Sequence, residues 1–269
     1  MSNPTNASCS IVLLSAGRGS RMASLTDRIP KSLLQVGDKL VLDWLLDPIL
    51  ARTTGELVVV AGHGAEHVKQ HLTHRYGSRI ATVLNERYEQ DVNILSVETG
   101  VAALEHPERG YLIVETDLLV DERVWDCVFS AIPQQDSFWV CQGVYGPRLT
   151  GGIVHARTDG HIDVIDYRPE YDPRFDGWPK MLGLLYVGPG QVTEDRRLRQ
   201  AAIERSLAQY YLVPWQQGLQ TLPCRVLQLP SYFARSFNTA ADFHSASAAF
   251  LSGPAARHDK LFATASNGT

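Results

Sequence analysis

The sequence lacks any apolar run that could cross a membrane, because none of its hydrophobic stretches approaches about eighteen residues. It also lacks a secretory signal: residues 1–8 are polar and have neither a charged region nor a long apolar core. Together these absences predict a cytoplasmic protein without a membrane partner. We expect residues 1–8 to form a mobile tail.

Cysteine is scarce, and excess positive charge is absent. The four cysteines, Cys9, Cys127, Cys141 and Cys224, lie far apart and form no Cys-x-x-Cys pair, so we expect reduced thiols. The formal net charge is -4, and no basic stripe is visible. Since a nucleic-acid partner needs such a stripe to neutralise its phosphates, the composition argues against one.

Two familiar phosphate-binding signatures are also missing. The apolar run 11–14 predicts a buried parallel strand that leads into the small-residue loop 15–20. The dinucleotide fingerprint needs a third glycine where Met22 stands, and the P-loop needs a Gly-Lys-Ser/Thr sequence that is absent. A nicotinamide-dependent oxidoreductase is therefore a poor candidate.

The same loop does contain the parts of a triphosphate-binding turn. Gly17 and Gly19 have no Cβ, so anionic oxygens can approach the loop's N–H groups closely. Arg21 adds a planar fork of donors, and Lys31, which follows Pro30, adds a compact charge that can follow a migrating phosphoryl group. The pattern predicts that the loop binds a polyphosphate.

Residues 14–21, Leu-Ser-Ala-Gly-Arg-Gly-Ser-Arg, followed by Pro30-Lys31, resemble the opening signature of the nucleotidyltransferase family. These enzymes join a nucleoside triphosphate to a sugar 1-phosphate, phosphocholine or a phosphonate and release pyrophosphate. The resemblance implies that Arg21, Lys31 and Asp117 are catalytic. It further implies a nucleotide site made of Leu14, Ser15, Ala16, Gly17, Arg18, Gly19, Ser20, Arg21, Lys31, Asn85, Tyr88, Asn93 and Ser96.

The first half of the chain alternates strands and helices. The apolar patterns predict strands at 11–14, 56–61, 79–85 and 110–115, and helices at 40–52 (which Pro48 shortens or distorts), 65–75 and from residue 96 to 104. Such alternation calls for a parallel sheet with right-handed crossovers. We expect an α/β fold: a Rossmann-like open mixed sheet, mainly parallel, with helices on both faces.

From residue 137 the pattern changes. Short strands are expected at 138–142, 152–156, 161–167 and 182–187 without regular helices between them, which indicates a small antiparallel extension on the acceptor side. After it we expect helices at 191–209 and 210–222, a strand at 224–229 and a final helix beginning within 236–243.

At 269 residues the chain is long enough for one α/β domain with small additions. We assign residues 9–252 to this domain, with a nucleotide-binding half at 9–136 and an acceptor-binding half at 137–252. Residues 253–269 are rich in Ala, Ser, Gly and Asn and are expected to form a loose tail.

The segment 85–96 suggests which base is bound. Taken alone, Asn93 is a good candidate to cap the following helix. The run also resembles the Asn-x-x-Tyr and Asn-x-x-Ser elements of cytidylyltransferases that act on phosphocholine and phosphonates, through Asn85, Tyr88, Asn93 and Ser96. The Gln-x-x-Gly-Thr element of the sugar 1-phosphate branch is missing.

Asp117 follows the strand 110–115, and the carboxyl end of a parallel strand faces the ligand crevice of an open α/β sheet. Its alternative role is to cap the helix that starts near Asp121, although Asp121 is better placed for that. The resemblance implies that Asp117 binds Mg²⁺. It also implies that Asn238 is the second metal ligand, at a position where many relatives have Asp.

Two cations are candidates for the acceptor side. The resemblance implies that either Arg168, in Tyr167-Arg168-Pro169 where sugar enzymes have Glu-Lys-Pro, or Lys180 binds the acceptor. A solvated surface lysine is the alternative for Lys180.

These observations predict a magnesium-dependent nucleotidyltransferase that condenses a nucleoside triphosphate, with CTP favoured, with a small phosphorylated or phosphonate acceptor. A sugar 1-phosphate uridylyl-, thymidylyl- or guanylyltransferase is the alternative enzyme. A non-catalytic nucleotide-binding regulator is the alternative from another class. Family members are often dimers or tetramers, so the resemblance also admits a homo-oligomer.

Overall fold

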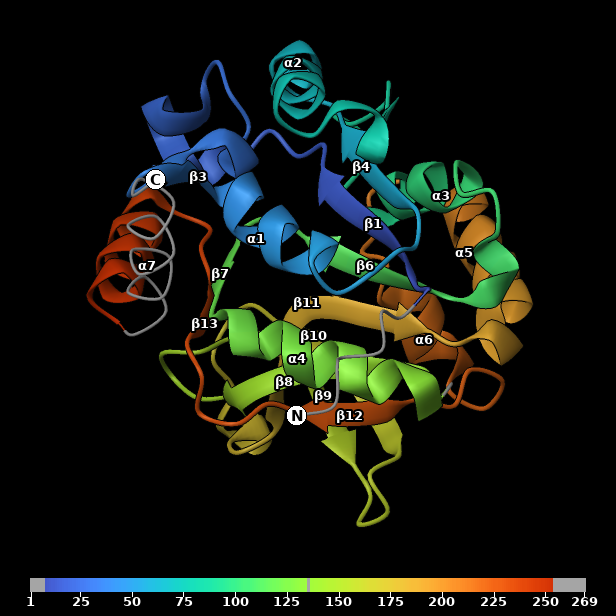
Figure 1. Cartoon of the computed structure of the whole chain (residues 1–269). Helices are drawn as coiled ribbons and strands as arrows, with labels where there is room; N and C mark the ends of the chain where they lie inside the picture. Colours follow the sequence, from blue (N-terminus) through green and yellow to red (C-terminus); the bar gives the residue numbers. More distant parts are fainter. Residues whose placement is uncertain (1–7, 135, 254–269) are drawn as a thin grey trace, which may run out of the picture.

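The computed structural model describes residues 8–134 and 136–253 (Figure 1). Apart from residues 8 and 253, the two expected tails lie outside this part of the chain. Among the described residues, no helix combines the length and the apolar character that crossing a membrane requires.

The centre of the fold is a mostly buried parallel sheet. Strand β1 (Ser10–Ser15) lies between β4 (Leu57–Ala61) and β6 (Tyr111–Glu115), and β5 (Ala81–Leu84) continues the sheet beyond β4. All four strands are parallel, so their carboxyl ends meet at one edge. The continuous apolar runs of β1, β4 and β6 are explained by helices that cover both faces of the sheet.

Two apolar layers enclose this sheet (Figure 1). On one face lie α1 (Val41–Leu50), α2 (Ala65–Tyr76), α4 (Glu122–Ala131) and α7 (Ala240–Ser252). On the other face lie α3 (Ile94–Ala102), α5 (Val192–Arg205) and α6 (Val213–Gly218). Pro48 lies inside α1, which ends two residues later, and Asp121 caps α4 by accepting a hydrogen bond from the Arg123 N–H.

The antiparallel strands extend the same sheet. Strand β11 (Pro179–Val187) pairs antiparallel with β6, β8 (Phe138–Val144) pairs antiparallel with β11, and β12 (Arg225–Gln228) pairs parallel with β8. A hairpin of β9 (Gly151–Ala156) and β10 (Ile162–Arg168) joins the side of β11. The expected mixed sheet, mainly parallel in its first half and antiparallel in its second, is confirmed.

Two small pairings escaped the sequence analysis. Strands β2 (Gln35–Val36) and β3 (Lys39–Leu40) form a short hairpin before α1. Strand β7 (Leu118–Val120) pairs antiparallel with β13 (Ala234–Ser236), and the Phe237 N–H donates to the Asp117 carbonyl at 3.0 Å. The second pairing carries residues 237 and 238 to the end of β6.

The two late helices are shorter than expected. The helix predicted at 191–209 ends at Arg205, because Ser206 is extended with φ of -170°. The helix predicted at 210–222 occupies Val213–Gly218, with Pro214 in its first turn. Short 3-10 turns lie at Ser20–Thr26, Lys31–Leu33, Gly77–Arg79, Pro107–Arg109, Ile132–Gln134, Pro173–Phe175 and Pro189–Gln191.

Candidate active site

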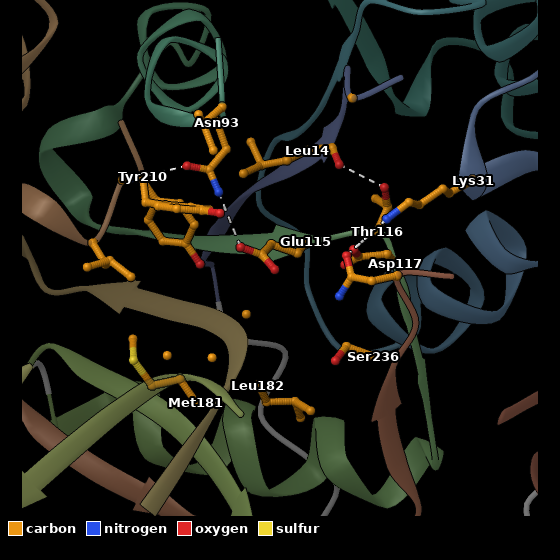
Figure 2. A pocket seen from close by; sticks show the side chains of 18 of the residues that line it. Leu14, Lys31, Asn93, Glu115, Thr116, Asp117, Met181, Leu182, Tyr210 and Ser236 are labelled. Carbon is orange, nitrogen blue, oxygen red and sulfur yellow. Dashed lines mark hydrogen bonds and ion pairs between the residues drawn. The ribbon is translucent and has the colours of Figure 1, made fainter. Parts of the chain in front are cut away.

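A cavity of about 390 Å³ opens at the carboxyl ends of β1 and β6 (Figure 2). Ligand crevices of open α/β sheets lie at this edge. Twelve of the residues expected to act in the site line the cavity: Leu14, Ser15, Ala16, Gly17, Gly19, Arg21, Lys31, Asn93, Ser96, Asp117, Lys180 and Asn238. Arg18, Ser20, Asn85, Tyr88 and Arg168 are not among the lining residues.

The glycine loop after β1 leaves the cavity open at one end. No atom lies within 4 Å of where a Cβ on Gly17 would stand. Gly19 has φ of +65°, and a Cβ there would lie 3.0 Å from Lys31 Cγ, so a side chain would be strained and would press on the lysine. The Thr26 hydroxyl donates to the Gly19 carbonyl at 3.0 Å and holds the turn. Gly17 therefore leaves open space beside the loop, and Gly19 allows the Lys31 side chain to pack closely against it.

Lys31, Asp117 and Asn238 meet at the same end of the cavity (Figure 2 shows the first two). The Lys31 ammonium lies 3.1 Å from Asp117 Oδ2 and donates to Asn238 Oδ1 at 3.3 Å. The Arg21 guanidinium also donates to Asn238 Oδ1, at 2.8 Å. The amide oxygen of Asn238 thus accepts hydrogen bonds from two cations, Arg21 and Lys31.

The oxygens at this end fit a hard divalent cation. Asp117 Oδ1 is buried and has no hydrogen-bond partner, and Asn238 supplies a second oxygen close by. Magnesium prefers such oxygen ligands and usually completes its shell with water and substrate phosphates. Among the described residues no group of three or more His, Cys, Asp or Glu gathers as a metal site. A magnesium ion here would depend on Asp117, Asn238 and a bound phosphate.

Glu115, the last residue of β6, faces the same cavity and was missed by the sequence analysis (Figure 2). Burial and the nearby charge of Asp117 raise the pKa of Glu115 to about 7, while Lys180 and Lys31 oppose the shift. Side chains two residues apart on a strand point the same way, so the position of Asp117 could have identified Glu115.

Lys180, in β11, lines the cavity and is partly buried, so it is not a solvated surface lysine. Its ammonium donates to the Met181 carbonyl at 2.7 Å. Burial lowers the pKa of Lys180, and the charge of Glu115 opposes this effect. The position allows Lys180 to meet an anionic group that enters the cavity.

Arg168, the other cation expected to bind the acceptor, contacts Asp166 and Phe175 and does not line the cavity. Its Nε donates to Asp166 Oδ2 at 2.8 Å, and its guanidinium lies 4.6 Å from the centre of the Phe175 ring. Of the two cations, only Lys180 lines the cavity.

The segment 85–96 forms a hydrogen-bond network around a residue that the sequence analysis did not single out. Asp91 accepts from Asn85 Nδ2 at 2.9 Å, from the Ser96 hydroxyl at 2.7 Å, and from the N–H groups of Leu95 and Ser96. Asp91 therefore caps α3, and Asn85 is occupied inside the protein. The expected side-chain cap by Asn93 is wrong.

Asn93 instead lines the cavity and points toward Glu115 (Figure 2). Its Oδ1 accepts from the Tyr211 N–H at 2.8 Å, and its Nδ2 donates to Glu115 Oε1 at 3.4 Å. Tyr88 packs against the backbone at Gly62, where an added Cβ would lie 2.7 Å from Tyr88 Cβ. Arg18 and Ser20 are exposed on the outer side of the loop.

Aromatic rings form part of the cavity wall. The Trp139 and Tyr211 rings stack with centroids 5.4 Å apart, and the Tyr167 and Tyr210 rings lie 4.4 Å apart. The Tyr210 hydroxyl donates to the Tyr167 hydroxyl at 3.1 Å. All four residues line the cavity, together with Glu115 and Lys180.

Comparison with known proteins places these features in a family. Residues 11–163, more than half of the chain, match the family described as the MobA-like NTP transferase domain. The chain is 27% identical over 166 residues to UTP–glucose-1-phosphate uridylyltransferase of Haloferax volcanii, covering 60% of this chain and 66% of that protein. It is 30% identical over 115 residues to 2-aminoethylphosphonate cytidylyltransferase of Lancefieldella rimae, covering 42% of this chain and 45% of that protein.

A solved structure of CTP:phosphocholine cytidylyltransferase from Streptococcus pneumoniae shares the fold, with a TM-score of 0.74 and 14% sequence identity. The superposition covers 90% of this chain and 99% of that chain. Alignments with the first curated relatives span only 32%, 66% and 36% of those proteins' own lengths.

Proposed function

The chain belongs to the family of MobA-like NTP transferase domains, and from this premise we propose that it is a magnesium-dependent cytidylyltransferase. Nucleotidyl transfer is the activity of the family. The finer proposal is that CTP reacts with a small phosphorylated or phosphonate acceptor, and that pyrophosphate is released. The chain's four cysteines are unpaired, which fits our proposal of a cytoplasmic enzyme.

One observation carries the proposal: Lys31 contacts Asp117 directly beneath the glycine loop. In this proposal the loop offers N–H groups to the β- and γ-phosphates, and Arg21, which also lines the cavity, adds a second cation. Both reactants are anions, so the main obstacle to reaction is their mutual repulsion. Fixed positive charge beside the α-phosphate lowers that barrier.

The reaction is an in-line displacement at the α-phosphorus. An ionised oxygen of the acceptor forms a bond to this phosphorus while the bond to the β-phosphate oxygen breaks, and the electron pair leaves with pyrophosphate. The acceptor oxygen is already ionised at neutral pH, so no nucleophilic side chain is needed. Lys31 stabilises the charge that builds on the α-phosphoryl oxygens.

The metal has a limited part in this scheme. A magnesium ion held by Asp117 and Asn238 supplies Lewis-acid stabilisation of the phosphate charge when it is bound. Asp117 Oδ1, which has no hydrogen-bond partner in the described part of the chain, would hold the ion, while Asp117 Oδ2 contacts the Lys31 ammonium.

The choice of CTP is supported by the segment 85–96 and by relatives that use CTP. The cytidylyltransferases of Lancefieldella rimae and Streptococcus pneumoniae are among the similar proteins. Within the segment, Ser96 and Asn93 line the cavity, while Asn85 fixes the position of Asp91, which caps α3. We propose that Lys180, rather than Arg168, binds the acceptor's phosphate or phosphonate group.

The test is release of pyrophosphate from each of the four nucleoside triphosphates with a panel of alkyl phosphates, alkyl phosphonates and sugar 1-phosphates. We expect turnover with CTP and a small non-sugar acceptor. Turnover only with UTP, dTTP or GTP and a sugar 1-phosphate would replace the proposal with the alternative suggested by the Haloferax volcanii relative. Tight CTP binding with no pyrophosphate from any acceptor would instead indicate a regulatory nucleotide-binding protein.

A further inference from the structure

Two buried serines line the cavity and play no part in the scheme above. Ser15 ends β1, and Ser32 lies in the 3-10 turn Lys31–Leu33. Their hydroxyl oxygens are 2.6 Å apart, and either hydroxyl can be the donor. Ser15 is 3% exposed and Ser32 is 1% exposed. This contact joins the strand that precedes the glycine loop to the turn that carries Lys31.

The serine pair has one proton more than its internal hydrogen bond uses. Each hydroxyl carries one proton and can accept two hydrogen bonds. Within the described part of the chain, Ser15 and Ser32 have no side-chain hydrogen-bond partner except each other. One O–H group therefore donates between the serines, and the second O–H group is left to donate elsewhere. A buried donor without an acceptor costs free energy, so this second proton is suited to a ligand in the cavity.

The other buried serine and threonine of the cavity wall already have fixed acceptors. The Thr116 hydroxyl donates to the Leu14 carbonyl at 2.7 Å (Figure 2). The Ser96 hydroxyl donates to Asp91 Oδ2, also at 2.7 Å. Of the buried serines and threonines that line the cavity in the described chain, only the Ser15–Ser32 pair keeps a hydroxyl proton that no protein group accepts.

The pair belongs to the same end of the cavity as the contact between Lys31 and Asp117. Ser32 follows Lys31 in the chain, and Ser15 ends β1, which pairs with β6 just before Asp117. The Lys31 ammonium lies 3.1 Å from Asp117 Oδ2. In the proposed function the α-phosphate binds beside this contact. Its oxygens are anionic acceptors, which form the stronger, charge-assisted hydrogen bonds with a hydroxyl donor.

We propose that the Ser15–Ser32 pair donates one hydrogen bond to an α-phosphate oxygen of the nucleotide, and that either serine can be the donor. When Ser15 donates to Ser32, the Ser32 proton is free for the phosphate, and the reversed bond frees the Ser15 proton. The pair can therefore keep one hydrogen bond to the phosphoryl group while the α-phosphorus moves from the leaving pyrophosphate toward the acceptor. This inference rests on the proposed function and adds two catalytic residues to it.

The proton count makes a specific prediction for serine-to-alanine variants. In Ser15→Ala or Ser32→Ala, the remaining hydroxyl keeps its own proton and can still donate it to the phosphate. Each single variant should lower kcat/KM for CTP only about threefold, because the donor loses the polarisation that its neighbour provides. The double variant has no donor, and the loss of a hydrogen bond to a charged oxygen should lower kcat/KM about fiftyfold. The double effect then exceeds the product of the single effects, as initial rates of pyrophosphate release will measure.

A purely structural role predicts a different pattern. If the contact only held the strand against the turn, the removal of either serine would break it, and each single variant would match the double variant. That outcome, or a double variant with the wild-type kcat/KM, overturns the proposal. Urea unfolding shows whether the variants fold. Removal of both partners together leaves neither hydroxyl without a partner, so the double variant should lose little stability.

Phosphorothioate analogues of CTP test whether the hydrogen bond reaches the α-phosphate. In each diastereomer of CTPαS, sulfur, which is a weak acceptor, replaces one of the non-bridging α-oxygens. The ratio of kcat/KM between the two diastereomers should differ by about tenfold between the wild type and the double variant, because only the wild type donates to one of these positions. The contribution of the metal to the ratio is common to both proteins. An equal ratio in the two proteins overturns the contact.

A control variant removes a buried hydroxyl elsewhere. Ser247→Ala changes a residue of α7 that does not line the cavity, and this variant should keep the wild-type kcat/KM. If the double alanine variant does not fold, Ser15→Ala combined with Ser32→Cys takes its place, because a thiol is only a weak donor. The same loss of kcat/KM is then expected, and wild-type turnover would contradict the proposal.

The outcomes distinguish this inference from the proposed function. If another triphosphate replaces CTP in the pyrophosphate assay, the same variants are compared with that nucleotide and its α-phosphorothioates. No pyrophosphate from any triphosphate with any acceptor overturns the proposed function itself. Calorimetric titration with CTP then measures the pair separately: the double variant should bind CTP more weakly than the wild type and the two single variants. Equal Kd values in the four proteins, or no binding, overturn the role of the pair as well.

Discussion

The two ends of the cavity are built from different chemistry. At the phosphate end, Arg21 and Lys31 are cations that contact oxygens of Asp117 and Asn238. At the acceptor end, Glu115 and Lys180 are enclosed by aromatic rings, and burial shifts both of their pKa values toward the neutral form. In the proposed function, the first end holds charge that stabilises the reacting phosphates. In the same proposal, the second end discriminates among acceptors, because a buried charge is costly unless its ligand matches.

The largest effect is expected at the phosphate end. Lys31→Ala removes the cation beside the α-phosphate and should lower kcat at least about a hundredfold. Lys69→Ala, an exposed lysine of α2, is the matched control and should keep wild-type turnover. Pyrophosphate release measures both, with circular dichroism to show that the variants fold. A normal kcat in Lys31→Ala would contradict the proposal that this end of the cavity stabilises the reacting phosphates.

A change at the acceptor end should affect a different kinetic constant. Lys180→Met removes the proposed partner of the acceptor's anionic group and should raise the KM for the acceptor by about thirtyfold. The KM for CTP should change less than threefold or so, because Lys180 does not belong to the glycine loop. Initial rates with each substrate varied in turn give both constants. If the KM for CTP rises more than the KM for the acceptor, Lys180 contacts the nucleotide and not the acceptor.

The buried Glu115 carboxyl should also make the free energy of unfolding depend on pH. The pKa of Glu115 is raised from 4.5 to about 7, so the folded state binds more protons than the unfolded state between these values. Its contribution to stability is therefore full below pH 4.5 and is lost as the pH rises through 7. From pH 5 to pH 8 the wild type should therefore lose free energy of unfolding that Glu115→Gln keeps. Allowing for partial solvent access, the difference in free energy of unfolding between the two proteins should change by about 2 kcal/mol in favour of Glu115→Gln. Urea unfolding of both proteins at the two pH values tests this, and parallel pH profiles would contradict it.

The smallest expected effect concerns the metal. Asn238→Asp adds a second carboxylate beside Asp117 and should tighten binding of Mn²⁺, used as a probe without nucleotide, by about tenfold. The same change should also strengthen the hydrogen bonds that Lys31 and Arg21 donate to this side chain, because the accepting oxygen would then carry negative charge. Electron paramagnetic resonance counts free Mn²⁺ directly. Weaker binding in this variant would show that the two cations, and not the metal, set the chemistry of position 238.

The phosphate end could be predicted from the sequence because its parts are nearly contiguous. Gly17, Gly19, Arg21 and Lys31 follow one strand within a short stretch, and each has a residue type that suits phosphate. The strand and helix pattern of the first half was predictable for a similar reason, since buried parallel strands are continuous apolar runs. The expected parallel core is confirmed.

The acceptor end could not be predicted in the same way, because its residues come from segments far apart in the chain. Glu115 looked like the last residue of a strand, and only the pairing of β6 with β11 shows that it faces Gly183. Asp91 was overlooked because its neighbour Asn93 is the better isolated cap. The helix predicted at 191–209 was too long because charged, helix-favouring residues give no stop signal before Ser206.

The pairing of β7 with β13 has a consequence for how the protein matures. Asn238 meets Lys31 across 207 positions of the chain, and it arrives there only when β13 docks. Contacts of such long sequence separation form late and slowly. On the ribosome, the glycine loop, Lys31 and Asp117 are therefore made long before the segment that brings Asn238 to them, and a nascent chain that has not yet extended past β13 carries an incomplete centre. In the proposed function, where Asn238 is a metal ligand, the emergence of that late segment therefore delays the onset of catalysis.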